Sequence, residues 1–388
     1  MKNISILGST GSIGVNTLDV IGSNPSIFKV VALSAGSNIT LLKDQIEKFR
    51  PKVVSVIDEN YSCQLKEMLD FPSRIKVLYG VDGYREIASV KEADMVVSAI
   101  VGAAGLLPTM EAIYAGKNIA LANKETMVMA GSLVVEAAAS KGVAILPVDS
   151  EHNAIFQCLA GSRQEDIKRI ILTASGGPFL NMSGEELLKV KPADALKHPR
   201  WEMGKKITID SASMMNKGLE VIEARWFFDV DINKIDVHIH PQSVIHSMVE
   251  FIDGSVIAQL GVADMRGPIS YALSYPERLS RTNCPSLDLL KVGTLELLPP
   301  DFEKFPNLRL AYLAGTKGGT MPAVLNASNE VAVEAFIAEK IRFVDMPTVV
   351  RGTLSLHRKK EISSIEDVLE ADRWARDEAT KIINTLKG

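Results

Sequence analysis

The chain has 388 residues, of which 46% are hydrophobic and 23% are charged, a composition typical of globular proteins. Its length allows two or three domains with buried cores, and its composition excludes intrinsically disordered and fibrous proteins. Lysine and arginine number 43 against 47 aspartates and glutamates, so the net charge of −4 gives no general attraction to nucleic acid or anionic membranes.

The three cysteines, Cys63, Cys158 and Cys284, are too few and too far apart for a disulfide framework or a cysteine-based zinc site, and they favour a reducing cytoplasm. The longest apolar run, residues 95–107, is too short to span a bilayer. Because a strand begins almost at the first residue, we expect no targeting peptide in this chain, unless one has been removed from it.

The first 150 residues alternate short β-branched runs with amphipathic patterns, which predicts a doubly wound parallel sheet flanked by helices. Helices are expected at 39–49, 106–115 and 124–140, with Gly116 and Gly142 as C-capping residues. Strands are expected at 3–7, 30–34, 53–57, 76–78, 95–99, 119–122 and 144–148, several of them apolar throughout because both faces are covered.

Beyond residue 148 the pattern becomes a mixture of helices and strands, which indicates a second α/β unit. Strands are expected at 170–173, 207–209 and 237–239, and helices after Ser183, which begins a capping box, and over 213–228. Residues 197–206 resemble neither element. Residues 244–261 alternate around Asp253-Gly254, which predicts a β-hairpin. A Pro- and Leu-rich segment at 285–307 precedes a helical region over 308–386, which ends in a long capped helix from Ser364.

Three glycines follow the first expected strand directly. Gly8, Gly11 and Gly14 have the spacing G-x-x-G-x-x-G and precede a helical pattern, a variant of the dinucleotide-binding fingerprint. Glycine permits a tight turn and close approach of a pyrophosphate, and the helix N-terminus offers N–H donors. The alternative is a tight glycine turn that binds no ligand.

The end of the second expected strand indicates which nucleotide is bound. An acid at this position would hold the ribose of NAD and repel a 2′-phosphate. The sequence here is Ser34-Ala-Gly36-Ser37-Asn38, which contains neither an acid nor an arginine. This favours NADP, with Ser37 and Asn38 as hydrogen-bond donors to the phosphate.

Two acids, Asp149 and Glu151, follow the last expected strand of the first region. In an extended backbone residues two apart face the same way, so both carboxylates are expected to point at one ion. A third acid, Glu220, lies on the helix expected at 213–228. Three oxygen ligands suit Mg²⁺ or Mn²⁺, whereas the alternative is a solvated turn and an unrelated glutamate.

Several short segments offer donors for a phosphate group, although turn and capping chemistry explains each of them equally well. In the basic segment 197–206, Trp201 lies between Pro199 and Gly204, a pattern typical of a lid that closes over an anion. The alternative is a tryptophan that anchors a surface loop. His198 in this segment is a candidate phosphate donor. The donor segments are Ser175-Gly-Gly-Pro178, Asp210-Ser211-Ala-Ser213 and Asn216-Lys217.

Three histidines, His238, His240 and His246, would allow a zinc site. His238 and His240 are two residues apart, but no third ligand follows them at a spacing diagnostic of zinc. We therefore interpret the histidines as structural.

Taken together, these segments resemble the 1-deoxy-D-xylulose 5-phosphate reductoisomerase family. The resemblance covers the first two-thirds of the chain in family order, and the helical tail fits the family's C-terminal domain. It rests on GSTGSIG (8–14), LANKE (121–125), PVDSEH (147–152), ASGGPF (174–179), HPRWEMG (198–204), MMNKGLE (214–220) and HPQSVIHSMVEF (240–251).

The resemblance implies a role for each matching position. Asp149, Glu151 and Glu220 match the ligands of a divalent metal, Mg²⁺ or Mn²⁺, with Co²⁺ as a further option. Trp201 matches the aromatic residue of a mobile flap that also covers the substrate. The substrate-binding positions are Lys124, Ser150, Ser175, His198, Ser211, Asn216 and Lys217.

The resemblance also implies that the cofactor is NADPH. Many family members have a basic residue where this chain has Ser37, so the affinity for the 2′-phosphate is the least secure part of the transfer. The matching cofactor contacts are Thr10, Gly11, Ser12, Ile13, Gly36, Ser37, Asn38, Asn123, Glu125 and Gly204.

The family rearranges a ketose phosphate by cleaving and rejoining its carbon chain, and NADPH then reduces the branched aldehyde to 2-C-methyl-D-erythritol 4-phosphate, early in the non-mevalonate route to isoprenoids. The metal acts as a Lewis acid, and Lys124 is expected to donate to a negatively charged oxygen. Asp149, Glu151 and Glu220 are therefore expected, with Lys124, to be the catalytic residues.

From the resemblance we expect a Rossmann-like NADPH domain over 1–149, an α/β catalytic and dimerisation domain over 150–285 with a flap at 197–206, a linker over 286–307 and a helical domain over 308–388. We expect a bacterial cytoplasmic homodimer, paired through the 244–261 hairpin, that binds neither nucleic acid nor membrane.

Two other classes of protein share some of these features. An NADP oxidoreductase of the semialdehyde-dehydrogenase type would have the glycine turn but needs a cysteine nucleophile, and only Cys158 lies near the candidate site in sequence. A non-catalytic nucleotide sensor would keep the glycines and have no use for the acids or the flap.

Overall fold

The computed structural model describes residues 1–70, 75–197, 204–280 and 284–386, and the chain divides into two compact units. The first unit comprises Met1–Thr126, Val134–Asn153 and Asp264–Pro285, and the second comprises Met127–Leu133, Ala154–Ala263 and Ser286–Gly388.

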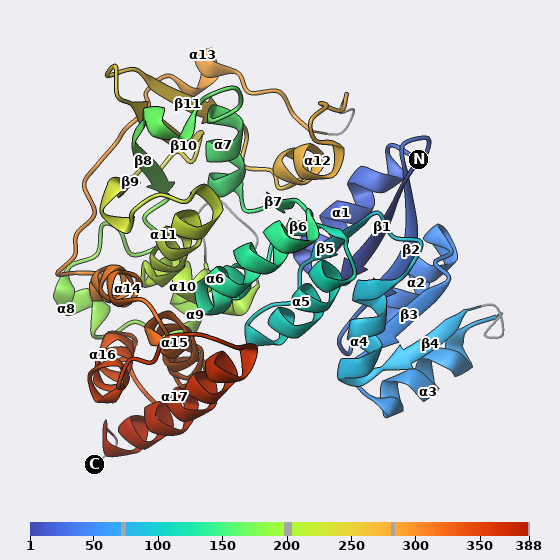
Figure 1. The fold of residues 1–388 in the computed structure, drawn as a ribbon. Helices are drawn as coiled ribbons and strands as arrows, with labels where there is room; N and C mark the ends of the chain where they lie inside the picture. The colour runs from blue at the N-terminus through green and yellow to red at the C-terminus, as the bar shows by residue number, and fades with distance from the viewer. Residues whose placement is uncertain (71–74, 198–203, 281–283, 387–388) are drawn as a thin grey trace. The chain divides into compact units, whose positions relative to one another are not determined.

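The first unit contains a parallel sheet with the strand order β4-β3-β2-β1-β5-β6-β7 (Figure 1). All seven strands expected from the sequence are confirmed. Because the strand order reverses between β1 and β5, the carboxyl edge near β1 is the place where an open α/β sheet binds its ligand. The strands are β1 (Lys2–Leu7), β2 (Phe28–Ser34), β3 (Val53–Val56), β4 (Lys76–Tyr79), β5 (Met95–Ser98), β6 (Asn118–Leu121) and β7 (Ile145–Pro147).

Helices connect these strands and cover the sheet. Ile4, Ile6, Val96 and Ile119 in the central strands are completely buried, as expected for strands with helices on both faces. The helices in this part of the chain are α1 (Ser12–Gly22), α2 (Ile39–Phe49), α3 (Glu59–Met68), α4 (Gly80–Ser89), α5 (Leu106–Tyr114), α6 (Lys124–Lys141) and α12 (Arg266–Ser274).

The second unit contains a four-stranded sheet in the order β11-β10-β8-β9. The expected hairpin is confirmed: β10 pairs antiparallel with β11, and Gly254 in the turn has a φ of 86°. β8 is antiparallel to β10 and parallel to β9. The strands are β8 (Ile167–Ala174), β9 (Ile235–Ile239), β10 (Ile245–Phe251) and β11 (Val256–Leu260).

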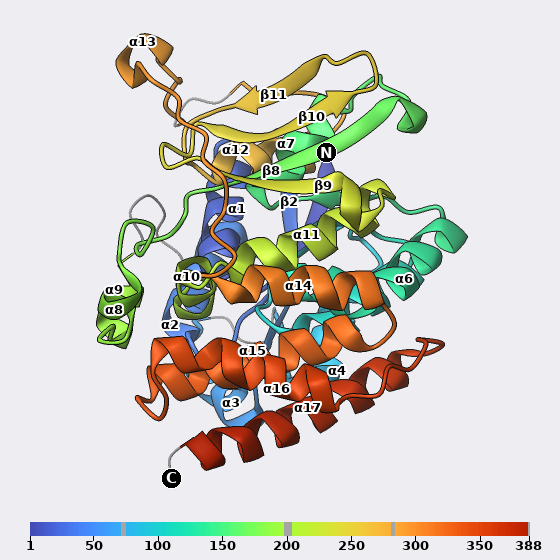
Figure 2. The same cartoon turned by 90° about the vertical axis from the view of Figure 1, so that its left-hand side faces the viewer.

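Helices are layered beneath this sheet: α11 contacts β8 and β9, α14 contacts α11, and α15 packs between α14 and α17 (Figure 2). The helical region after residue 308 is confirmed, with α14 beginning at Pro306. Ser364 and Asp367 cap the last helix by reciprocal hydrogen bonds. The helices are α7 (Ser150–Cys158), α8 (Gly184–Leu187), α9 (Pro192–Ala195), α10 (Lys205–Ala212), α11 (Met215–Phe228), α13 (Leu289–Val292), α14 (Pro306–Lys317), α15 (Met321–Ile337), α16 (Met346–Leu356) and α17 (Ile365–Leu386).

The strand expected at residues 207–209 is wrong, because these residues lie in α10, as do Lys205 and Lys206. The Thr208 hydroxyl donates to the carbonyl oxygen of Gly204, which precedes the helix, and Ile209 is completely buried. A short β-branched run does not distinguish a strand from a buried helix, and here burial of a helical face outweighs β propensity.

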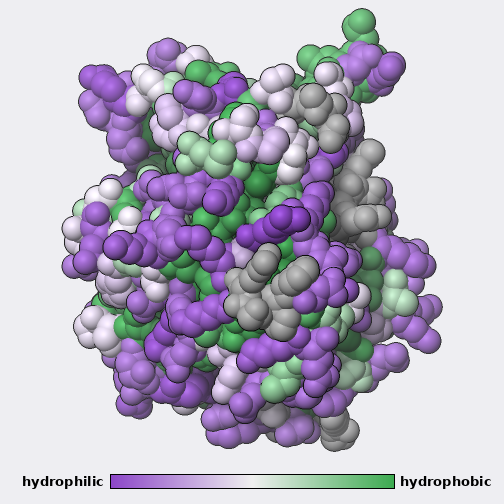
Figure 3. All heavy atoms as spheres, turned by 90° about the vertical axis from the view of Figure 1, so that its right-hand side faces the viewer, coloured by the Kyte–Doolittle hydropathy of each residue, from purple (hydrophilic) through white to green (hydrophobic). Residues whose placement is uncertain are grey.

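Among the described residues no helix is both long and apolar enough to cross a membrane. Hydrophilic side chains are spread widely over the face shown in Figure 3, with hydrophobic residues between them.

Candidate functional site

The glycine turn after β1 is held by close backbone contacts. A Cβ added to Gly14 would lie 2.3 Å from the carbonyl oxygen of Gly8, and one added to Gly8 would lie 2.6 Å from that of Ala99. Gly11 precedes α1, and no side-chain hydrogen bond caps the helix. The turn therefore requires glycine and presents the N-terminus of α1 to a ligand, as a pyrophosphate needs.

The candidate 2′-phosphate residues follow β2. Gly36, Ser37 and Asn38 are exposed, and the Asn38 side chain accepts a hydrogen bond from the Leu41 amide at 3.2 Å, which caps α2. Ser37 therefore presents its hydroxyl at the surface beside the start of a helix.

The loop after β6 is fixed by Asn123. Its side-chain amide donates to the carbonyl oxygen of Gly102 at 2.9 Å, and its oxygen accepts from the Thr126 amide at 2.9 Å, which caps α6. Both contacts hold the first residues of α6, Lys124 and Glu125, which are buried.

Lys124 forms an ion pair with Asp149 at the carboxyl edge of the seven-stranded sheet. The Lys124 Nζ lies 2.8 Å from Asp149 Oδ2, and the two side chains are only 5% and 17% exposed. Asp149 follows β7, which is the neighbour of β6 in the sheet. An ion pair so shielded from solvent is much less screened than a surface pair.

The extended backbone expected for Asp149 to Glu151 is wrong, because α7 begins at Ser150 and Glu151 lies in its first turn. An acid in the first turn interacts favourably with the helix dipole, which explains the early start of this helix. The Ser150 hydroxyl donates to Glu151 Oε2 at 2.6 Å. His152 adjoins these acids in sequence but was not among the predicted site residues. Its Nδ1 lies 3.9 Å from Asp149 Oδ2.

In the second unit, two of the expected phosphate segments lie together. A Cβ added to Gly177 would lie 2.8 Å from the Ser211 carbonyl oxygen, and the φ of Gly177 is 69°. The loop that follows β8 is thus packed against the C-terminal end of α10. Ser211 and Ser213 were expected in a loop or at a helix N-cap, but Ser211 lies within α10 and Ser213 ends it.

Glu220 is buried in α11 with two of the expected substrate residues around it. The Asn216 side-chain amide donates to Glu220 Oε1 at 2.5 Å, and Lys217 forms an ion pair with Oε2. Glu220 and Lys217 are 1% and 4% exposed, so the lysine compensates a carboxylate that would otherwise be costly to bury.

Two candidates, His198 and Trp201, lie outside the described residues. Gly204, which follows them, is exposed and precedes α10.

Hydrogen bonds of the fold explain two of the three histidines, His240 and His246. His240 Nδ1 lies 2.7 Å from the Glu296 carbonyl oxygen, and its Nε2 accepts from the Val244 amide at 3.1 Å. His246 Nε2 lies 3.3 Å from the carbonyl oxygen of Val262. The interpretation of His240 and His246 as structural is therefore confirmed.

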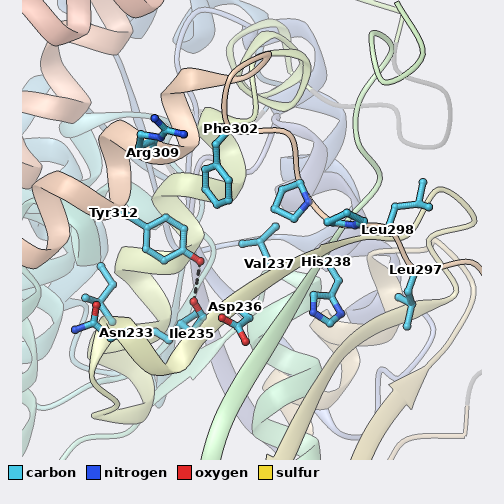
Figure 4. A pocket seen from close by; sticks show the side chains of 13 residues that line it. Asn233, Ile235, Asp236, Val237, His238, Leu297, Leu298, Phe302, Arg309 and Tyr312 are labelled. Atoms are coloured by element: carbon cyan, nitrogen blue, oxygen red, sulfur yellow. Dashed lines mark hydrogen bonds between the residues drawn. The ribbon is translucent and has the colours of Figure 1, made fainter.

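A cavity of about 690 Å³ lies beside β9 and is lined by α14 and the segment before it (Figure 4). Tyr312 donates to the carbonyl oxygen of Ile235 at 2.7 Å, and burial raises its pKa. His238, interpreted above as structural, lines this cavity, but none of the described residues expected to bind the metal, cofactor or substrate does.

Three family models match the chain. The model described as 1-deoxy-D-xylulose 5-phosphate reductoisomerase matches residues 4–131, and models of C-terminal domains of the same enzyme match 145–228 and 260–378. The chain is 55% identical over 386 residues to the 1-deoxy-D-xylulose 5-phosphate reductoisomerase of Geotalea daltonii, covering 100% of both chains. It is 57% identical over 383 residues to that of Chlorobaculum tepidum, covering 99% of this chain and 100% of the relative.

Solved structures agree. The Zymomonas mobilis 1-deoxy-D-xylulose 5-phosphate reductoisomerase in complex with NADPH superposes with a TM-score of 0.92 at 44% identity, covering 98% of this chain and 99% of that chain. A DOX-P reductoisomerase in complex with NADPH, fosmidomycin and magnesium has a TM-score of 0.94 at 42% identity, covering 100% and 99%. The chain therefore belongs to the 1-deoxy-D-xylulose 5-phosphate reductoisomerase family.

Proposed function

We propose that this chain rearranges and reduces 1-deoxy-D-xylulose 5-phosphate to 2-C-methyl-D-erythritol 4-phosphate with NADPH and a divalent metal ion, early in the non-mevalonate route to isoprenoids. The observation that carries the proposal lies at one edge of the seven-stranded sheet. The glycine turn follows β1, and the Lys124–Asp149 ion pair follows β6 and β7 of the same sheet. A nucleotide at the turn and a reacting group at the ion pair would therefore share that edge.

The residues of the first unit fit a dinucleotide. The contact between Gly14 and the Gly8 carbonyl leaves no room for a side chain, as expected where a helix begins close to a bound pyrophosphate. The proposed cofactor contacts are Thr10, Gly11, Ser12, Ile13, Gly36, Ser37, Asn38, Asn123, Glu125 and Gly204.

The acids fit a hard divalent cation. We propose Asp149, Glu151 and Glu220 as its ligands, since these three acids could hold a metal ion. Carboxylate oxygens are the donors that Mg²⁺ and Mn²⁺ prefer. Lys217 balances the negative charge of Glu220, and a bound cation would do the same.

We propose that residues of the second unit bind the substrate's phosphate group. The packing of the β8 loop against Ser211 supports this assignment, because a glycine loop, a hydroxyl and a buried lysine make an anion site without a basic surface. The proposed substrate residues are Lys124, Ser150, Ser175, His198, Trp201, Ser211, Asn216 and Lys217.

The bound metal ion would supply Lewis-acid stabilisation of negative charge on oxygen, and NADPH would supply the hydride. Lys124 is held by Asp149 in a site that largely excludes water. There its ammonium group donates a hydrogen bond to the substrate oxygen that becomes negatively charged during the reaction. Binding of the remote phosphate orients the carbon chain, so that its binding energy serves the reaction.

The properties of Cys158, the cysteine nearest the candidate site in sequence, disfavour the semialdehyde-dehydrogenase alternative. Cys158 is buried, and burial raises the pKa of its thiol to about 11. A nucleophilic cysteine requires the opposite shift, because the thiolate is the reactive form.

We further propose that two copies of the chain pair through β11. This strand is the edge of its sheet, and Val256 and Ile257 are 50% and 46% exposed. An exposed apolar edge strand is a template for pairing with another chain.

We also propose that the enzyme is cytoplasmic, as its few cysteines suggest. We propose further that residues 1–149 act as the NADPH domain, residues 150–285 as the catalytic domain and residues 308–388 as the helical domain.

NADPH oxidation tests the proposed function directly. The protein is mixed with 1-deoxy-D-xylulose 5-phosphate, NADPH and Mn²⁺, and absorbance at the NADPH band is followed with and without a chelator. We expect consumption that stops with the chelator and returns with excess Mn²⁺ or Mg²⁺. NADPH consumption that persists after metal removal would favour the dehydrogenase alternative. No NADPH consumption even with metal present would favour the nucleotide sensor.

A further inference from the structure

Helix α10 determines where one of the phosphate-binding candidates stands. It carries Ser211, whose carbonyl oxygen faces the backbone of Gly177 so closely that a Cβ would lie 2.8 Å away. After Ser213 the chain turns through Met214, which has a φ of 61°, into α11. A small shift of α10 would therefore change the spacing between Ser211 and the β8 loop.

A buried carboxylate connects α10 to the C-terminal helices. Asp210 is 1% exposed, and its Oδ1 accepts a hydrogen bond from Nδ2 of Asn329 at 2.7 Å. Its Oδ2 lies 2.9 Å from Nζ of Lys206, one turn earlier on the same helix. Asn329 is completely buried in α15, a helix that contacts α10.

This carboxylate is energetically unfavourable for the stability of α10 alone. Asp210 lies near the C-terminal end of α10, where the helix dipole disfavours negative charge, and Lys206 precedes it in the weaker order for such a pair. Asn329 Oδ1 is buried without a hydrogen-bond partner among the described residues. Apolar residues would pack at both positions without these costs, so the polar contact suggests a requirement for exact placement.

We propose that Asn329 is a positioning residue: by holding Asp210 it fixes α10 so that Ser211 and the β8 loop keep the spacing that binds the substrate's phosphate group. The C-terminal helices thereby contribute to substrate affinity, although Asn329 does not touch the reacting atoms. This inference rests on the proposed function.

Asn326 offers a matched control on the same helix. It is also an asparagine and completely buried, but its side-chain amide donates to Glu330 at 3.1 Å and contacts the Met129 sulfur at 3.4 Å instead of a residue of α10. If replacing any buried asparagine of α15 with alanine changed the substrate KM, Asn326→Ala and Asn329→Ala would show the same change.

The experiment compares the two alanine variants in the NADPH oxidation assay. Loss of one hydrogen bond to a buried carboxylate should raise the KM for the ketose phosphate about tenfold in Asn329→Ala, with kcat changed less than about threefold and the KM for NADPH unchanged. Asn326→Ala should keep the KM for the ketose phosphate within about twofold of wild type. Equal KM values in the two variants, or a loss confined to kcat, would overturn the inference.

An exchange of the two side chains keeps the test decisive if the alanine variant does not fold. Asn329→Asp removes the donor and places two carboxylates against each other, so it should weaken substrate binding. Asp210→Asn combined with Asn329→Asp restores an amide–carboxylate hydrogen bond between the helices, so it should recover at least part of the substrate affinity lost in Asn329→Asp. A folded double variant with no recovery would contradict the proposed role. A wild-type chain that leaves NADPH unoxidised would overturn the proposed function itself, which distinguishes the two failures.

Discussion

At the scale of single residues, the nucleotide turn depends on the absence of side chains. Gly14 lies in α1 but is pressed against the backbone of Gly8, so that a Cβ at this position would lie 2.3 Å from the Gly8 carbonyl oxygen. This contact brings the start of the helix up to the end of β1, which is what close approach of a pyrophosphate requires.

Replacing Gly14 with alanine should therefore push α1 away from the turn. We expect Gly14→Ala to weaken NADPH binding at least about tenfold, equivalent to ~1.4 kcal/mol, and to lower the melting temperature. Titration of NADPH fluorescence and a thermal melt measure both. Gly22→Ala is the control, because the nearest atom its Cβ would meet is a ring carbon of Phe49 at 3.7 Å. Wild-type NADPH affinity in Gly14→Ala would refute this account of the turn.

At the scale of elements, we propose that the connection between β2 and α2 holds the cofactor's 2′-phosphate. Asn38 already uses its side-chain oxygen to cap α2, so Ser37, exposed beside it, is the candidate for closest contact with the phosphate. A single hydroxyl supplies no positive charge, so a basic residue at position 37 should bind the 2′-phosphate more tightly.

Ser37→Arg should add a charge-assisted hydrogen bond to the 2′-phosphate. We expect the KM for NADPH to fall about fivefold, as one contact of ~1 kcal/mol gives, while the KM for NADH stays the same. Steady-state kinetics with both nucleotides provide the comparison. An equal change for both nucleotides would show that residue 37 does not meet the phosphate.

The elements predicted best from the sequence are those in which buried apolar residues form a clear local pattern. The strands of the first sheet are short runs dominated by apolar residues. Helix α2 has the predicted bounds because Asn38 caps it. The strand expected at 207–209 and the extended backbone expected at Asp149 to Glu151 failed, because in both places a helix start decided the conformation. β-Branched content and alternation do not register such a start.

Contacts between segments far apart in the chain leave no pattern in the local sequence. Asp210 and Asn329 are 119 residues apart, and no local pattern marks Asn329 as a partner of α10. The residues expected to bind phosphate could be singled out by type, but the packing of Gly177 on Ser211 depends on how β8 and α10 are placed in the fold.

At the scale of the whole molecule, the proposed dimer is testable through its edge strand. Ile257→Lys places a charge on β11, and lysine on an edge strand opposes pairing. We expect light scattering at micromolar concentration to give a dimeric mass for wild type and a monomeric mass for this variant. Val81→Lys, at a residue that is 55% exposed in the first unit, should remain dimeric. A monomeric wild type would contradict the dimer proposal.

The central proposal is that Asp149, Glu151 and Glu220 bind one catalytic cation. Mn²⁺ titration followed by electron paramagnetic resonance tests it most directly, in wild type and in Asp149→Asn, Glu151→Gln and Glu220→Gln. Glu303→Gln, at an 85% exposed side chain, is the control.

We predict one tight Mn²⁺ site per wild-type chain, an affinity reduced more than about tenfold in each of the three variants, and unchanged NADPH binding in all of them. Turnover should fall with the loss of metal. Wild-type Mn²⁺ affinity in folded Glu220→Gln would contradict the proposal, because the cation would then be held without the Glu220 carboxylate.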